Sequence, residues 1–286
     1  MNSDKCFKDR ITDYLLPILI IFLFFDAISI FMGDLKYYSV FFIFIYVFFH
    51  CYITKGFSKS IMFFSITIVF SFFSELFGTI WGGIYGAYYY LPRPPLMVFD
   101  SVPIQTPFSW SVIIYTCYCL TNIIVGSHKI KSIQVTKYGV NLPFFLSIIF
   151  LSLIDATAAM NIDMMMDPIA ANHSWVWIFG GPYYGVPITN FIGWFAVTFC
   201  STIIFRFFEQ TKKKINTKSQ HSLLNIPVVI YIFYFLKYSF GALKGDILDS
   251  TRQAFPELVL IGFSAMMPFI LLSIYSLHFR DREEEQ

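Results

Sequence analysis

The sequence predicts an all-α polytopic membrane protein, a helical bundle of about eight transmembrane helices, with seven as the alternative. The 286-residue chain is 57% hydrophobic and only 13% charged, whereas a soluble domain carries about 25% charged residues. Several apolar runs reach the roughly 20 residues that a helix needs to cross the hydrocarbon core. The chain shows no internal repeat and no soluble segment, so we predict a single transmembrane domain over residues 1–286.

The predicted spans are residues 14–33, 37–53, 59–81, 108–127, 143–163, 188–208, 225–243 and 257–278. No small-residue cleavage site follows the polar N-terminal residues, so the first span is expected to be retained. Fifteen Lys and Arg residues fall on one side of the spans and four on the other, with Lys237 inside the seventh. Because cytoplasmic loops are rich in Lys and Arg, both termini are predicted to be cytoplasmic in a multi-pass cell-membrane protein. The two long connections, 82–107 and 164–187, then lie together on the opposite face.

The acids inside the spans are the first candidates for a site, because ionisable groups in a membrane are costly and usually functional. Glu75 lies in the half of the third span that is nearer the long connections. Asp163 and Asp167 stand four residues apart at the end of the fifth span, so their carboxylates share a helix face. Pro168 is expected to end that helix, since it lacks an N–H and restricts the residue before it. The three carboxylates are therefore predicted to converge at one end of the bundle.

These acids also have structural alternatives. The glutamate could make a structural hydrogen bond, and the two aspartates could cap helices or pair with Arg93 or Arg252. Asp155, two turns earlier in the fifth span, is expected to make a polar contact between helices or to hold a residue of the site in position without contacting the substrate. Asp26 and Lys237 are expected to form an interhelical ion pair.

Several chemistries are excluded by motifs that the sequence lacks. His50, His128, His173, His221 and His278 form no HxxxH or HxxH pair, which argues against a di-iron or other metal site. No Gly-x-Gly-x-x-Gly or Gly-x-Ser-x-Gly motif indicates a dinucleotide domain or a hydrolase elbow. No basic stripe with interleaved aromatics indicates nucleic-acid binding. Two chemistries remain: cofactor-independent acid–base catalysis, and a metal-assisted reaction of a diphosphate substrate in which carboxylates hold the metal.

Two blocks of motifs carry most of the acids and aromatics. The first comprises Ser74-Glu75-Leu-Phe-Gly78, Tyr85-Gly86-Ala-Tyr88-Tyr-Tyr90, Val102-Pro103 and Pro107-Phe108-Ser-Trp110. The second comprises Asp163-Met-Met-Met-Asp167-Pro168, Trp175-Val-Trp177, Tyr183-Tyr184-Gly185-Val186-Pro187 and Asn190-Phe-Ile-Gly193-Trp194. In order and spacing over roughly residues 70–198, this core resembles the carotenoid hydratase family, which includes carotenoid 1,2-hydratases and bisanhydrobacterioruberin hydratases. The run Leu91-Pro-Arg-Pro-Pro95 departs from the family's pattern.

The resemblance implies a hydro-lyase of carotenoid biosynthesis that needs neither metal nor cofactor. It would add water to a terminal isoprenoid double bond of an acyclic or monocyclic carotenoid and form a tertiary alcohol. Asp163 or Glu75 would be the acid, and Asp167 with Asn190 would position the water. The partners would be a long polyene, water and the lipid bilayer, with no nucleic acid. The aromatic residues expected to bind the substrate and shelter its cation are Tyr85, Tyr88, Trp110, Trp175, Trp177, Tyr183, Tyr184 and Trp194.

Two other functions stay open. The run Asn161-Ile-Asp163-Met-Met-Met-Asp167 is similar to the aspartate motifs with which intramembrane prenyltransferases hold Mg²⁺ and a diphosphate. Their second acidic motif would correspond to Lys244-Gly-Asp246-Ile-Leu-Asp249. The other function is that of a non-enzymatic lipid or pigment carrier, although the two halves of the chain lack the matching broken helices of many transporters.

Overall fold

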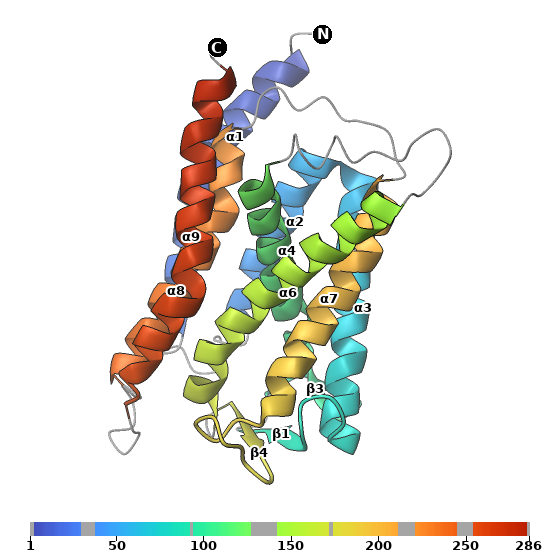
Figure 1. Ribbon diagram of the computed structural model, residues 1–286, viewed down its shortest axis with the longest axis vertical. Helices are drawn as coiled ribbons and strands as arrows, with labels where there is room; N and C mark the ends of the chain where they lie inside the picture. The colour runs from blue at the N-terminus through green and yellow to red at the C-terminus, as the bar shows by residue number, and fades with distance from the viewer. Residues whose placement is uncertain are drawn as a thin grey trace.

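The computed structural model describes residues 3–29, 38–91, 94–126, 142–171, 174–210, 221–244 and 254–284. Over these residues the protein is an all-α bundle, as predicted (Figure 1). Each predicted span coincides with one described helix. The helices are α1 (Ser3–Ser29), α2 (Ser39–Lys55), α3 (Phe57–Trp81), α4 (Thr106–Val125), α6 (Leu142–Ala170), α7 (Ile188–Gln210), α8 (His221–Lys244) and α9 (Glu257–Glu284).

Six of the described helices, α3, α4, α6, α7, α8 and α9, are long and apolar enough to cross a membrane. Helices α1 and α2 contain shorter apolar stretches, Tyr14–Ile28 and Ser39–Lys55. The outward faces carry many exposed Phe, Leu and Ile side chains, such as Phe150 and Leu260. Apolar surface of this extent is suited to lipid, and the chain is an integral membrane protein.

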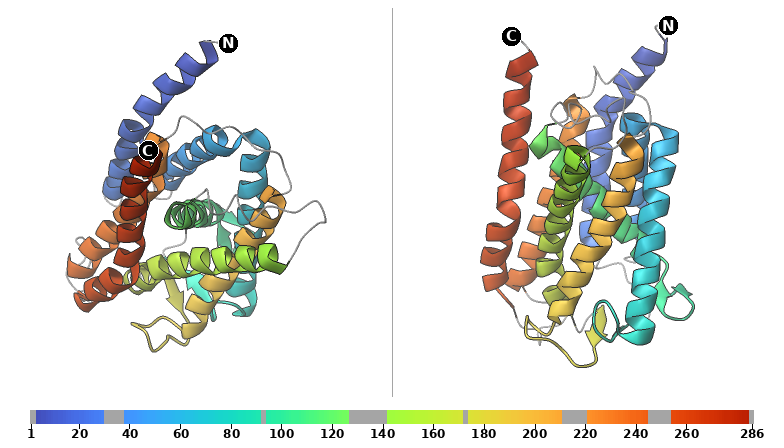
Figure 2. Two further views of the ribbon diagram at one scale, coloured as in Figure 1. Left: turned by 45° about the horizontal axis from the view of Figure 1, so that its top comes forward. Right: turned by 45° about the vertical axis from the view of Figure 1, so that its right-hand side comes forward.

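Helix α4 lies at the centre of the bundle, among α2, α3, α6, α8 and α9 (Figure 2). Its sequence contains no charged residue, which allows burial on all sides. Its small polar residues Ser111, Thr116 and Thr121 donate hydrogen bonds to carbonyls four residues earlier in the same helix. These hydroxyl groups are therefore satisfied without water inside an apolar core.

Pro168 does not end its helix, contrary to the prediction, because α6 continues to Ala170. A proline in a helix cannot donate to the carbonyl four residues earlier, which here belongs to Met164. The hydroxyl of Tyr183 donates to that carbonyl instead, at 3.1 Å. A side chain from the following connection therefore replaces the missing N–H, and the last turn of α6 is kept.

The two long connections pair with each other as short strands, which the sequence did not predict. Strand β1 (Tyr88–Tyr90) of the first connection runs antiparallel to β4 (Trp175–Trp177) of the second. Within the first connection, β2 (Met97–Val98) runs antiparallel to β3 (Val102–Pro103). The pairing confirms that the two connections lie at the same end of the bundle (Figure 1). Which side of the membrane this end faces stays a prediction.

Two polar contacts between helices are confirmed. Lys237 on α8 donates to Asp26 on α1 at 2.5 Å, and Ser39 at the start of α2 donates to the same carboxylate at 2.8 Å. Asp155 on α6 forms two hydrogen bonds with Arg206 on α7, at 2.8 and 2.7 Å. Arg206, which lies inside the predicted span 188–208, is one of the fifteen basic residues assigned to one side of the spans, and its side chain is buried in the bundle.

Candidate active site

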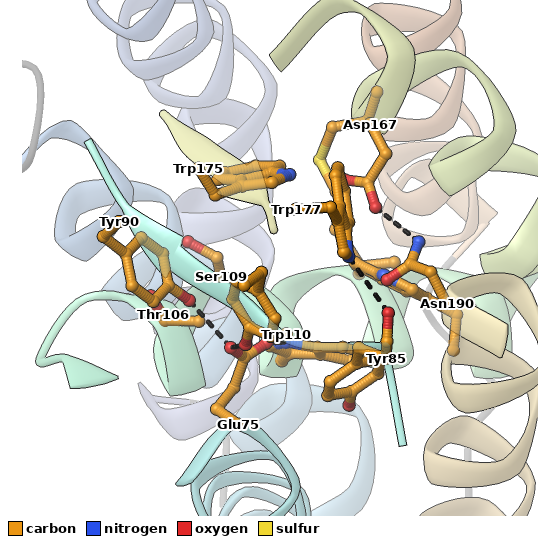
Figure 3. A pocket seen from close by; sticks show the side chains of 14 residues that line it. Glu75, Tyr85, Tyr90, Thr106, Ser109, Trp110, Asp167, Trp175, Trp177 and Asn190 are labelled. Carbon is orange, nitrogen blue, oxygen red and sulfur yellow. Dashed lines mark hydrogen bonds between the residues drawn. The ribbon is translucent and has the colours of Figure 1, made fainter. Parts of the chain in front are cut away.

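A cavity of about 140 Å³ lies beneath the β1–β4 pair, between the adjoining ends of α3, α4, α6 and α7 (Figure 3). Its walls combine two carboxyl groups, an amide, seven aromatic side chains and a few small polar or apolar groups. The lining residues are Glu75, Tyr85, Tyr88, Tyr90, Thr106, Ser109, Trp110, Ile113, Met166, Asp167, Trp175, Trp177, Asn190 and Trp194. Of the predicted site residues, only Asp163, Tyr183 and Tyr184 are not among them.

Glu75 is buried at one wall of the cavity and accepts three hydrogen bonds. The hydroxyl of Tyr90 donates to Oε2 at 2.7 Å, the hydroxyl of Tyr88 donates to the same oxygen, and the indole of Trp110 donates to Oε1 at 2.7 Å. Burial, reinforced by the neighbouring Glu75 carboxyl, raises the pKa of Tyr88 and of Tyr90 well above the ordinary value. Both phenols therefore stay protonated at neutral pH, and Glu75 is surrounded by donors that suit a charged carboxylate.

The strand β1 explains why two tyrosines reach the same carboxylate. Side chains alternate along a strand, so Tyr88 and Tyr90 point inward while Tyr89 is 48% exposed. Tyr90 was missing from the predicted site, although this alternation within three consecutive tyrosines was a signal for it. The pairing of β1 with β4 places Trp177 opposite Tyr88 and Trp175 opposite Tyr90, with ring centroids 6.1 and 6.2 Å apart.

The second acidic group is the pair Asp163 and Asp167, held by one amide. The Nδ2 atom of Asn190 on α7 donates to Asp163 at 2.8 Å and to Asp167 at 2.5 Å. This contact agrees with the predicted common face of the two aspartates. Asp167 lines the cavity, whereas Asp163 is fully buried behind it, and its Oδ1 atom has no hydrogen-bond partner among the described residues.

Tyr85 forms part of the cavity wall and is fixed by both polar and packing contacts. Its hydroxyl donates to Ser74 at 2.7 Å, and its carbonyl accepts from the indole of Trp177 at 3.0 Å. Its ring lies against Gly78 of α3 and Gly193 of α7, where an added Cβ would come within 2.7 and 2.6 Å of ring carbons. Only glycine leaves room for the ring at these two positions.

Two predicted substrate contacts have other neighbours. Tyr183 bonds to α6 and packs its ring edge against Phe191, with ring centroids 5.1 Å apart. Tyr184 packs against Phe255 with the same centroid separation. The lining residues that the sequence reasoning missed, besides Tyr90, come mainly from the first two turns of α4 and from the end of α6. They are Thr106, Ser109, Ile113 and Met166.

Among the residues that the structure describes, no group of three or more His, Cys, Asp or Glu side chains is placed to hold a metal ion. The second acidic motif considered for a prenyltransferase falls mostly on residues 245–250, outside the described ranges. Arg93 and Arg252, considered as partners of the aspartates, also lie outside them. Those two interpretations stay predictions.

A comparison with known proteins assigns this chain to a family. Residues 35–247, which are 213 of 286 residues, match the family described as "carotenoid biosynthesis protein". The matched region includes every residue that lines the cavity. No curated protein and no solved structure matches the chain. The chain belongs to the carotenoid biosynthesis protein family, and its role is in carotenoid biosynthesis.

Proposed function

We propose that this protein adds water across a terminal isoprenoid double bond of an acyclic or monocyclic carotenoid and produces a tertiary alcohol. The observation that carries the proposal is the meeting of two acidic groups from distant segments, Glu75 and the Asp163–Asp167 pair, around one aromatic cavity. A cavity near 150 Å³ holds a molecule about the size of benzene. A cavity of about 140 Å³ therefore suits one end unit of a polyene, with the rest of the chain outside it.

Asp167 is the group that we assign to deliver the proton. Two buried carboxyl groups on one amide repel each other if both are charged, so the pair keeps one proton between them. Asp167 faces the cavity and can present this proton to an alkene, whereas Asp163 lies behind it. Asn190 donates one hydrogen to each carboxyl and holds the pair in place.

Protonation of the less substituted alkene carbon leaves a tertiary cation on the carbon that carries the two methyl groups. Four indoles and three phenols line the cavity and offer π faces to that cation, and Glu75 offers a negative charge. Water then attacks the cation, and its surplus proton returns to Asp167. The cycle consumes one alkene and one water, forms one C–H and one C–O bond, and restores the acid.

The proposal is tested by expressing the protein in a host that accumulates acyclic carotenoids and has no hydratase of its own. Mass spectrometry of the pigments should show a product heavier by one water, formed without added metal. Asp167→Asn and Glu75→Gln should strongly reduce the amount of that product. Glu257→Gln is the matched control, because this acid lies in the first turn of α9 and does not line the cavity.

Absence of a hydrated pigment with every acyclic end group tested would reject the proposal. Full hydration activity of both cavity variants would overturn the roles assigned to Asp167 and Glu75. Mg²⁺-dependent consumption of a prenyl diphosphate would favour the prenyltransferase alternative.

A further inference from the structure

The wall of the cavity contains a carboxylate, Glu75, that has no basic partner in the described part of the chain. Three other buried or half-buried acids, Asp26, Asp155 and Glu209, each pair with Lys or Arg. The described residues provide no such ion pair for Glu75, whose hydrogen-bond partners are two phenols and an indole. Hydrogen bonds from neutral donors stabilise the charge of Glu75 but do not cancel it.

The rings around Glu75 make the cavity attractive to a positive charge. Tyr88 packs beside Trp177, Tyr90 packs beside Trp175, and each pair lies on the strands that cover the cavity. On the opposite side Trp110 and Trp194 stack with centroids 3.7 Å apart. Aromatic faces attract cations most strongly where water is excluded, and aromatic cages of this kind bind quaternary ammonium groups.

Hydrogen bonds within the protein hold four of these six rings in place without a ligand. Trp110 and the two tyrosines are held by Glu75 itself, and Trp177 is held by the carbonyl of Tyr85. A preformed site spends little free energy on ordering its side chains when it binds. The stable ligand that matches it is a compact cation with an apolar surface.

We propose that this cavity binds the quaternary ammonium head group of an alkyltrimethylammonium ion, with Glu75 as its counter-ion. The alkyl chain takes the place of the polyene, so the compound competes with the carotenoid end group. The inference rests on the proposed function in one respect, since trimethylammonium carries the positive charge and the geminal methyl groups of the tertiary cation formed by protonation. Its binding, however, requires no turnover.

The tryptophans provide the readout. Four of the five, Trp110, Trp175, Trp177 and Trp194, line the cavity. The fifth, Trp81, is 67% exposed at the end of α3 and lies outside it. Full-length protein carrying Trp81→Phe, in lipid nanodiscs, therefore reports cavity binding through its tryptophan emission. The first ligand is decyltrimethylammonium. The second is the neutral hydrocarbon of the same shape, in which a carbon atom replaces the nitrogen. Both ligand concentrations are expressed as moles of ligand per mole of lipid.

The ammonium ion should bind about tenfold more tightly than its neutral isostere. In Glu75→Gln this preference should disappear, while binding of the neutral compound should be unchanged. Tyr90→Phe, which keeps the ring and the charge of Glu75, should retain the preference. Equal binding of the two ligands by the parent protein would overturn the proposal, and so would a preference that survives Glu75→Gln.

If Glu75→Gln binds neither ligand, the comparison in the parent protein and in Tyr90→Phe decides alone. Failure of this inference and failure of the proposed function are distinguishable. Hydrated pigment without ammonium binding would overturn only the cation site. Ammonium binding without hydrated pigment would leave the cation site and reject hydration as the reaction.

Discussion

The buried acids Glu209 and Asp155 pair with cations, whereas the acids at the cavity accept hydrogen bonds from neutral donors. Lys55 at the end of α2 donates to Glu209 of α7 at 2.8 Å, and the hydroxyl of Tyr118 donates to the other oxygen of the same carboxylate. Arg206, one turn earlier on α7, is bonded to Asp155 and lies 4.4 Å from the ring centre of Tyr118. Each of these charges is neutralised by a neighbouring helix.

At the cavity end Glu75 is bonded to phenols and an indole, and Asp163 and Asp167 share one amide. A buried ion pair leaves no net charge for a ligand, but removing one partner is costly. A carboxyl held by neutral donors keeps its charge or its proton for a ligand. We infer that the ion-paired acids stabilise the packing of the helices and that the acids at the cavity carry the chemistry. Substitutions in the two groups test this comparison.

The largest expected effect is on activity. Asp167→Asn should lower the rate of pigment hydration about 10²–10⁴-fold, because a positioned acid contributes about that much and an amide cannot replace it. The variant should remain folded, since an amide fills the same space beside Asn190. Pigment analysis gives the rate, and size-exclusion chromatography in detergent checks the fold. Retained activity together with lost stability would place Asp167 with the structural acids.

The next largest effect is on the stability that the ion-paired acids provide. Arg206→Met should destabilise the protein by about 3–5 kcal/mol, because it leaves Asp155 charged, buried and without its partner. The double variant Arg206→Met, Asp155→Leu should recover most of this loss, since neither charge remains. Unfolding of the purified protein in detergent measures both. A double variant no more stable than the single one would show that the pair itself stabilises the bundle.

The apolar runs were enough to predict the helices, because a membrane demands long apolar segments and their number fixes which connections lie together. For the same reason the convergence of Glu75 with Asp163 and Asp167 was predictable. The pairing of β1 with β4 was not, because strands of three residues carry no pattern that distinguishes them from a loop. Without the strand, the alternation within the three tyrosines did not show which of them face the cavity, and Tyr90 was missed.

The continuation of α6 past Pro168 was also beyond local sequence reasoning. It depends on Tyr183, a residue from the next connection that supplies the missing donor. The sequence rule for proline describes the helix alone, and a tertiary contact offsets it here.

An intermediate effect is expected where the cavity wall meets the helices. Gly193→Ala places a methyl group 2.6 Å from the ring of Tyr85, so the ring must shift towards the cavity. Overpacking of this kind costs about 1–3 kcal/mol of stability. The smaller cavity should raise KM by a larger factor than it lowers kcat. Gly83→Ala is the matched control, because its added Cβ has no neighbour within 4 Å. Equal KM values for the two variants would contradict the assigned role of Tyr85 in the wall.

The smallest effect concerns the hydrogen bond from Tyr183 to the Met164 carbonyl, to which we assign a structural role. Tyr183→Phe removes the donor to the Met164 carbonyl and should cost about 1 kcal/mol of stability, with pigment hydration nearly unchanged. In a Pro168→Ala background the helix supplies its own N–H to that carbonyl, so the same substitution should cost less. Unfolding of the four proteins in the double-mutant cycle measures the difference. An identical cost in both backgrounds would show that Tyr183 does not replace the donor lost at Pro168, and a large loss of activity would move Tyr183 back among the substrate contacts.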